Sequence, residues 1–106
     1  MPPAWAYGKT MTPAESAAVD LRRRRLLFRA THRGTKENDL MIGGYVAAHL
    51  ATLDHAAIDA LEAVMELPDT DLTDWLTGRA PIPPEADTPT LRAILEYVAA
   101  GGAHRA

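Results

Sequence analysis

The segment Arg33-Gly34-Thr35-Lys36-Glu37 places both signs of charge around a single glycine. An arginine donates paired, charge-assisted hydrogen bonds to a carboxylate, and a glutamate accepts hydrogen bonds from a base. The glycine between them can adopt a left-handed backbone and has no side chain to block the approach of a binding partner. These residue types suit recognition of another macromolecule, so we interpret residues 33–37, called the corner below, as a docking surface.

Helix signals before the corner predict a long first helix. Thr12 and Glu15 have the spacing of a capping box, and Pro13 fits the first helical position. The pattern predicts a helix from Pro13 to Arg33, ended by Gly34 as a left-handed cap.

A second helix is predicted directly after the corner. Thr35 is its expected cap, and Glu37 lies near the positive end of its dipole. A simple exposed ion pair between Arg33 and Glu37 is the alternative interpretation of the corner, and it would contribute little. The pair Gly43-Gly44 inside this helix indicates close packing against a neighbouring helix.

Three more helices complete the chain. One begins after Asp54 and ends at Pro68, a short one begins at Asp69 or Thr70 and ends at Gly78, and the last begins at Thr88. The proline-containing stretch 80–87 should be an extended connector. Apolar residues recur at helical spacing without strand-like alternation. The sequence therefore predicts an all-α fold, a compact five-helix bundle over residues 13–100, with a flexible arm at 1–12 and a flexible tail at 101–106.

Composition narrows the chemistry. The 106 residues suit one domain, and the absence of cysteine excludes disulfides and thiolate catalysis. No apolar run is long enough to cross a bilayer, and the first twelve residues lack the apolar stretch of a secretory signal. The net charge is −3, yet seven of the 11 lysines and arginines lie between Arg22 and Lys36. We expect a basic corner opposite an acidic body, which would steer partners.

Four arginines form a stripe along the first helix: Arg22, Arg25, Arg29 and Arg33. A solvated helix face is the plain interpretation. Nucleic-acid binding through phosphate contacts is the alternative function, a small helical module using this basic helix. The negative net charge and the lack of interleaved aromatic residues argue against it.

No catalytic or metal-binding constellation is legible. The four histidines, His32, His49, His55 and His104, lack the spacing of metal ligands. No serine–histidine–aspartate arrangement and no glycine-rich phosphate loop is visible. Asp69, Asp71 and Asp74 are explained by helix-start chemistry. We predict no catalytic residue, no metal site and no enzymatic activity.

Two stretches together resemble a known family. His32 to Leu40 resembles the R-G-x-x-E signature of the flavinylation factor SdhE family, bacterial relatives of mitochondrial succinate dehydrogenase assembly factor 2. Asp69 to Gly78 resembles that family's D-x-D-L-x-x-W-L segment. Their order and separation also fit, over roughly residues 21–98.

The resemblance implies a five-helix fold and a function. The family promotes covalent attachment of FAD to the flavoprotein subunit of succinate dehydrogenase and, in some bacteria, of fumarate reductase. The corner docks on that subunit near its flavin-bearing histidine, so the cofactor is the partner's and the chain carries none of its own. Residues that match or flank the motif are the implied partner-binding set: Arg29, His32, Arg33, Gly34, Glu37, Asp39 and Tyr45.

The expected location is the cytoplasm of a bacterium or the mitochondrial matrix of a eukaryote. Nothing in the sequence indicates more than a monomer, and the lack of a long apolar run predicts no membrane insertion. An interaction protein unrelated to flavin, such as an antitoxin-like regulator, is the third class that the sequence leaves open.

Overall fold

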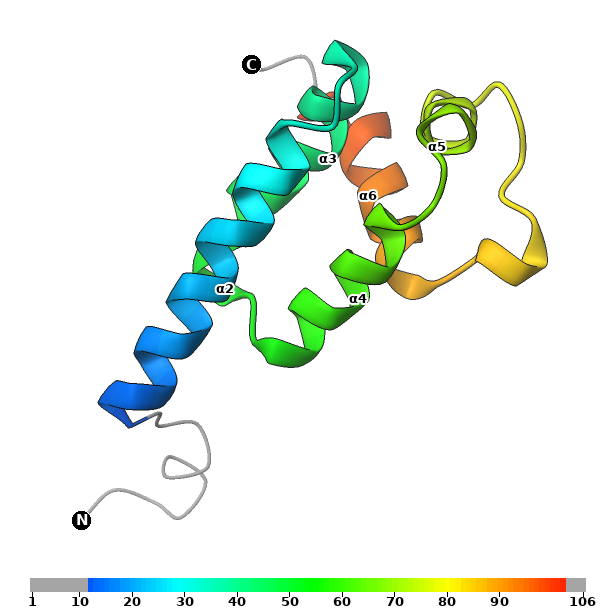
Figure 1. The fold of residues 1–106 in the computed structure, drawn as a ribbon. Coiled ribbons are helices and arrows are strands. Elements are labelled where there is room, and N and C mark those ends of the chain that lie inside the picture. Colours follow the sequence, from blue (N-terminus) through cyan, green and yellow to red (C-terminus); the bar gives the residue numbers. More distant parts are fainter. Residues whose placement is uncertain (1–11, 103–106) are drawn as a thin grey trace.

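Five α-helices and two 3₁₀ turns make up residues 12–102, the part of the chain that the computed structural model describes (Figure 1). No strand occurs in that range, so the all-α, five-helix expectation is confirmed. In chain order the elements are α2 (Pro13–Thr31), α3 (Lys36–His49), η1 (Leu50–Thr52), α4 (His55–Met65), α5 (Asp69–Leu76), η2 (Pro84–Ala86) and α6 (Pro89–Ala99).

Side-chain caps define most of the helix starts, as the sequence predicts. Thr12 and Glu15 form the capping box of α2. Thr35, Asp54 and Thr88 each accept a hydrogen bond from a backbone N–H in the first turn of α3, α4 and α6. Helix α5 differs, because Pro68 precedes it without a side-chain cap. Two carboxylates in its first turn instead favour its N-terminus electrostatically.

The end of α2 corrects the predicted boundary. The helix stops at Thr31, not Arg33, and His32 leaves the helical region with φ −126° and ψ 44°. The Arg33 backbone N–H donates to Asp39 Oδ1 at 2.6 Å instead of to a carbonyl of α2. Gly34 does adopt a left-handed backbone, at φ +104°. Helix α2 therefore ends three residues before the glycine, and the next backbone N–H, that of Arg33, donates to a side chain of α3.

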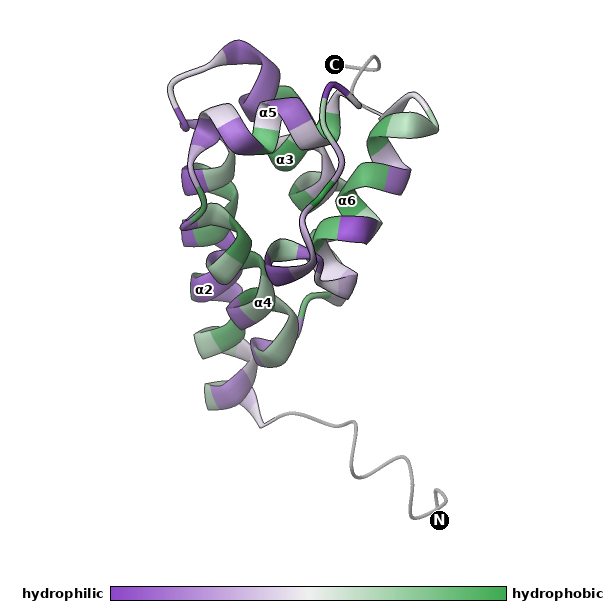
Figure 2. Cartoon of the chain, turned by 90° about the vertical axis from the view of Figure 1, so that its right-hand side faces the viewer, coloured by the Kyte–Doolittle hydropathy of each residue, from purple (hydrophilic) through white to green (hydrophobic). Residues whose placement is uncertain are grey.

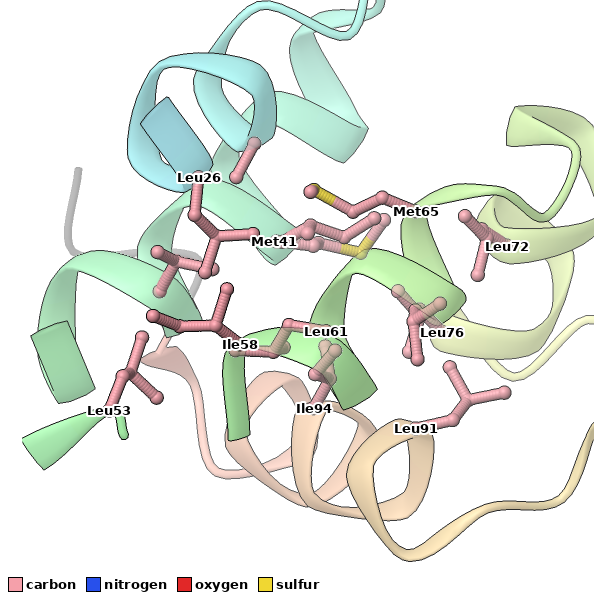
Figure 3. Packing of buried hydrophobic residues seen from close by; sticks show 14 of the residues in the cluster. Leu26, Met41, Leu53, Ile58, Leu61, Met65, Leu72, Leu76, Leu91 and Ile94 are labelled. Atoms are coloured by element: carbon pink, nitrogen blue, oxygen red, sulfur yellow. The ribbon is translucent and has the colours of Figure 1, made fainter. Parts of the chain in front are cut away.

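The core runs through all five helices (Figure 3). Helix α3 contacts α2, α5 and α6, and α4 contacts α2 and α6. Hydrophobic and hydrophilic residues alternate along the helices (Figure 2), and α4, α5 and α6 are the clearly amphipathic ones. The largest fully buried apolar side chains come from every helix: Val19, Leu26, Ile42, Val46, Ile58, Leu61, Leu72, Leu91 and Ile94.

The connector before α6 is more ordered than an extended link. Residues 84–86 form a 3₁₀ turn, and Ile82 and Ala86 are buried in the core. Prolines prevent a longer helix here, yet both of these apolar side chains belong to the core cluster.

Gly43 confirms the close packing expected of α3. A Cβ on Gly43 would lie 2.7 Å from Thr31 Cγ2 and 3.1 Å from the Ala30 carbonyl oxygen of α2. The two helices meet so closely that an alanine at this position would require a neighbour to shift.

The predicted arm and tail fall mostly on residues 1–11 and 103–106, which lie outside the described range. Thr12, the last arm residue, belongs to the cap of α2. Gly102, in the predicted tail, accepts a hydrogen bond from the Tyr97 hydroxyl at 3.2 Å. Among the described helices, none has the length and apolar content to cross a membrane.

Candidate docking site

Arg33 is held inside the fold. Its side chain is 10 % exposed, and its Nε donates to Asp69 Oδ1 at 2.7 Å. Its Nη2 donates to the Leu67 carbonyl oxygen at 3.4 Å. The expectation of an exposed Arg33, alone or paired with Glu37, is therefore wrong. The physical reason is that α5 starts beside the corner and supplies a carboxylate that the sequence places 36 residues away.

Asn38 extends this network into the interior. Its side chain is fully buried, the one buried polar residue of the described chain. Its amide group donates to the carbonyl oxygen and to Oδ1 of Asp69, both at 3.0 Å, while its Oδ1 accepts from the Thr73 hydroxyl at 3.0 Å. A buried amide with all these partners satisfied fixes one register between α3 and α5.

Sequence reasoning missed Asn38 and the second role of Asp69. Asp69 does lie in the first turn of α5, as its helix-start interpretation requires, but it also bridges Arg33 and Asn38. The available signal was an asparagine on the apolar side of a predicted helix. Nothing local indicates its partner, because the partner lies 31 residues further along the chain.

The outer part of the corner remains open. Gly34, Thr35, Lys36 and Glu37 are all exposed. Neither Lys36 nor Glu37 forms an ion pair with any residue from 12 to 102. A Cβ on Gly34 would meet nothing within 4 Å, so solvent lies over the bend. Hydrogen bonds of Arg33 hold the buried side of the corner in place. Its exposed side presents the Glu37 carboxylate and the Gly34 backbone to solvent.

A groove adjoins Glu37. Helix α3 contributes Leu40 and Met41 beside the glutamate, and α6 contributes Leu95 and Val98. The last residue of α5 and the turn after it contribute residues 76–79. Both sequence stretches singled out above thus line one surface, because the buried network holds the start of α3 against α5.

The remaining candidate residues are only partly gathered here. Asp39 accepts from the Arg33 backbone and shapes the bend. His32 is exposed beside the corner, and Arg29 lies one turn before it on α2. Tyr45 is eight residues beyond Glu37, roughly 12 Å along α3. Its ring packs edge-on against Tyr97 of α6, at 5.8 Å between centroids, so Tyr45 belongs to the α3–α6 contact.

Two of the four arginines of the stripe, Arg22 and Arg29, face acidic residues of α4. Arg22 Nη2 lies 2.7 Å from both Asp59 and Glu62 of α4. Arg29 pairs with Glu62 at 3.6 Å and with Glu66 at 3.3 Å. Hydrogen bonding to Asp59 is the main reason that the pKa of Arg22 is raised above its usual value. The expected separation of a basic corner from an acidic body is therefore wrong, since α4 places its carboxylates against the stripe.

Metal ligation finds no support in the described chain. Between residues 12 and 102, no three histidine, aspartate or glutamate side chains are placed to hold a metal ion. His55 instead accepts a hydrogen bond from Arg22 at 3.0 Å, and His32 and His49 donate to the carbonyl oxygens of Phe28 and Tyr45.

Comparison with known proteins identifies the family. Residues 24–98 match the family described as flavinator of succinate dehydrogenase. The chain belongs to this family. The matched range includes the whole corner, the buried network and every lining residue of the groove except Ala99.

Individual relatives agree with this placement. The chain is 52 % identical over 75 residues to the FAD assembly factor SdhE of Acetobacter pasteurianus, covering 71 % of this chain and 69 % of that protein. It is 37 % identical over 84 residues to succinate dehydrogenase assembly factor 2-A, mitochondrial, of Drosophila ananassae, covering 76 % and 53 %. It is 26 % identical over 83 residues to the corresponding mitochondrial factor of Dictyostelium discoideum, covering 78 % and 59 %.

These matches differ in extent. The chain spans little more than half the length of the mitochondrial relatives that it matches. No solved structure matches the chain. The assignment to the family depends on the sequence match. The geometry of the site comes from the fold of this chain.

Proposed function

We propose that this chain promotes covalent attachment of FAD to the flavoprotein subunit of succinate dehydrogenase by docking on that subunit through the corner. The family description and the names of the relatives support the task. The observation that carries the docking role is the Arg33–Asp69–Asn38 network, which fastens the inner side of the corner while its outer side stays open.

Two exposed residues would make the contact. Glu37 presents a carboxylate that no described residue pairs with, so a lysine or arginine of the partner is its natural counterpart. Gly34 lets the partner's backbone approach, because no side chain stands over the bend. Arg33 acts mainly by positioning the bend, since its guanidinium already binds Asp69 and the Leu67 carbonyl oxygen.

The chain would act as an assembly factor and not as an enzyme. In this proposal the flavin and the histidine that bonds it both belong to the partner, and the chain carries no cofactor of its own. Docking selects the one arrangement of the flavoprotein in which those atoms are aligned. Alignment of reacting groups is worth several kcal/mol of activation free energy.

The setting of the reaction is part of the proposal. A bacterial relative and mitochondrial relatives support action in the bacterial cytoplasm or the mitochondrial matrix. We infer a monomer that meets one flavoprotein at a time. The flavoprotein of fumarate reductase is a second client to examine in the same assay.

Co-expression tests the proposal. The flavoprotein subunit is produced with the wild-type chain, with Glu37→Ala, with Glu85→Ala, or alone, and flavin fluorescence is read in the gel after denaturation. Glu37 and Glu85 are both exposed and unpaired within residues 12–102, so each substitution should change the free energy of unfolding by less than about 0.5 kcal/mol. We expect full fluorescence with wild type and Glu85→Ala, and a loss with Glu37→Ala.

The result that would contradict the corner is equal fluorescence with Glu37→Ala and wild type. Equal fluorescence with and without the wild-type chain would contradict the function itself.

A further inference from the structure

A line of exposed side chains follows the side of α2 that faces away from the core. Leu21, Arg25, Phe28 and His32 recur at steps of four, three and four residues, which places them on one line along the helix. All four are exposed, and the line ends beside Arg33. We call these four residues the outer stripe.

The outer stripe holds both large hydrophobic side chains that are exposed among residues 12–102. Leu21 is 43 % exposed and Phe28 is 62 % exposed. The buried residues of α2, namely Val19, Leu26 and Ala30, lie elsewhere on the helix. Water therefore surrounds most of an aromatic ring, and such rings are the side chains that most often anchor protein interfaces.

The ring of Phe28 is held in place by His32. Their centroids are 4.0 Å apart and the rings are 17° from parallel. The His32 Nδ1 lies 2.7 Å from the Phe28 carbonyl oxygen, so Nδ1–H donates to it and the imidazole stays beneath the phenyl ring. A ring held before binding loses less entropy on docking than a free one.

Charge distinguishes this side of α2 from the side that meets α4. Arg22 and Arg29 are neutralised by carboxylates of α4. Arg25 and its neighbour Arg24 are exposed and form no ion pair with any residue in the described range. The outer stripe therefore combines an aromatic anchor with uncompensated positive charge, and its complement is an apolar pocket bordered by carboxylates.

We propose that the outer stripe is the second half of the docking surface, and that it receives an acidic face of the same flavoprotein, with Phe28 in an apolar pocket and Arg25 against a carboxylate. This rests on the proposed function. His32 is adjacent in sequence to Arg33, so one partner surface can cover the corner and the stripe together. A second copy of this chain fits poorly, because it would bring the guanidiniums of both copies together without a carboxylate on the stripe.

The test measures binding of the full chain to the purified flavoprotein subunit lacking covalent flavin, at low and moderate salt. The variants are Phe28→Ser, Phe28→Tyr and Arg25→Glu. Arg92→Glu on α6 is the control, because it makes the same change in net charge at another exposed arginine. Circular dichroism and light scattering of each free variant record its fold and its oligomeric state.

Phe28→Ser should raise Kd about 30-fold, the size of an interface hot spot. Phe28→Tyr should stay within about threefold, because the ring is kept. Arg25→Glu should raise Kd and flatten its salt dependence, since an attractive charge pair becomes repulsive. Arg92→Glu should bind as wild type does.

Wild-type affinity for both Phe28→Ser and Arg25→Glu would overturn the inference. A dimer of the wild-type chain that Phe28→Ser dissolves would overturn it too, because a second copy would then occupy the stripe. If Glu37→Ala abolishes flavinylation while the stripe variants bind normally, only this inference fails. If the wild-type chain neither binds nor flavinylates the subunit, the proposed function fails as well.

Discussion

At the scale of single residues, the corner divides into a fastened side and a free side. Arg33 binds Asp69 and is nearly covered, whereas Glu37, four residues later, is exposed and unpaired within the described chain. Residues that look equivalent in a short motif thus have different physical tasks. One sets the shape of the bend, and the other is free to meet a partner.

Arg33→Ala tests the fastened side. We expect the free energy of unfolding to fall by about 2 kcal/mol, because Asp69 loses a charge-assisted partner in a mostly covered site. The value should stay below that of a fully buried pair, since the Asp69 side chain is 34 % exposed. Urea denaturation measures it.

Arg92→Ala is the matched comparison for that measurement. Arg92 also bonds a carboxylate, that of Asp87, but the Arg92 side chain is 49 % exposed where that of Arg33 is 10 % exposed, so the loss should be below about 1 kcal/mol. Equal losses for the two arginines would contradict a structural role for Arg33.

Gly34→Ala tests the backbone of the bend. Because Gly34 has φ +104° and open space around it, alanine should cost about 1–2 kcal/mol through backbone strain alone. Gly101→Ala is a control with the same physics, at φ +88° and also in open space. We expect similar melting-temperature shifts for both, with covalent flavin in a co-expressed partner reduced for Gly34→Ala only.

At the scale of elements, the site depends on α3, which packs against α2 on one side and against α5 on the other. Helix α3 begins at the corner, and α5 supplies Asp69 and Thr73 to the network around Asn38. The path of α3 relative to α2 is set by the contact at Gly43. A substitution at Gly43 should therefore shift the corner although Gly43 does not contact it.

Gly43→Ala tests that transmission. Its added methyl would lie 2.7 Å from Thr31 Cγ2, so α3 must shift, at a cost of about 1–3 kcal/mol. Adding Thr31→Ser removes that methyl and should recover part of the loss, as thermal denaturation of the single and double variants would show. Failure of Thr31→Ser to restore any stability would mean that the Ala30 carbonyl oxygen, at 3.1 Å, sets the limit instead.

At the scale of the whole molecule, most arginines of the basic segment 22–36 form ion pairs with carboxylates of the same chain. Helix α4 places carboxylates against the arginines of α2, and Arg33 is bound by α5. Only Arg24, Arg25 and Lys36 of the basic segment stay exposed without an ion pair from residue 12 to residue 102. Too few free cations remain on one line to follow a phosphate backbone.

A salt titration with duplex DNA checks this conclusion. Because each phosphate contact adds about 0.9 to the slope of log K against log salt, three free cations predict a slope no steeper than about −3. We expect no binding at micromolar chain concentration and physiological salt. A slope of log K against log salt as steep as six or more phosphate contacts require would instead support nucleic-acid binding.

Much of the local structure could be predicted from the sequence because it depends on neighbours. Thr12, Thr35, Asp54 and Thr88 cap helices through bonds that span three residues, and such bonds follow from residue type and spacing. The left-handed backbone of Gly34 and the close contact at Gly43 could also be predicted, because a glycine that follows a helix or lies within one usually has these roles.

The end of α2 and the partner of Arg33 could not be predicted in the same way. The hydrogen bond that the Arg33 backbone N–H donates to Asp39 competes with continuation of the helix, and no propensity scale includes such a bond. Asp69 reaches Arg33 only because α3 and α5 pack together. Sequence spacing favours Glu37, a near neighbour, as the partner of Arg33. In the structure the partner is Asp69, which is distant in the sequence.

By itself, therefore, the sequence determined the helices, the glycine bend and the family, because these rest on residue types at short spacing. Tertiary structure alone decided that Arg33 faces inward, that Glu37 stays free and that Phe28 stays exposed. The physical reason is that burial and ion pairing depend on which distant helix lies alongside, and that arrangement is settled by the packing of the core as a whole.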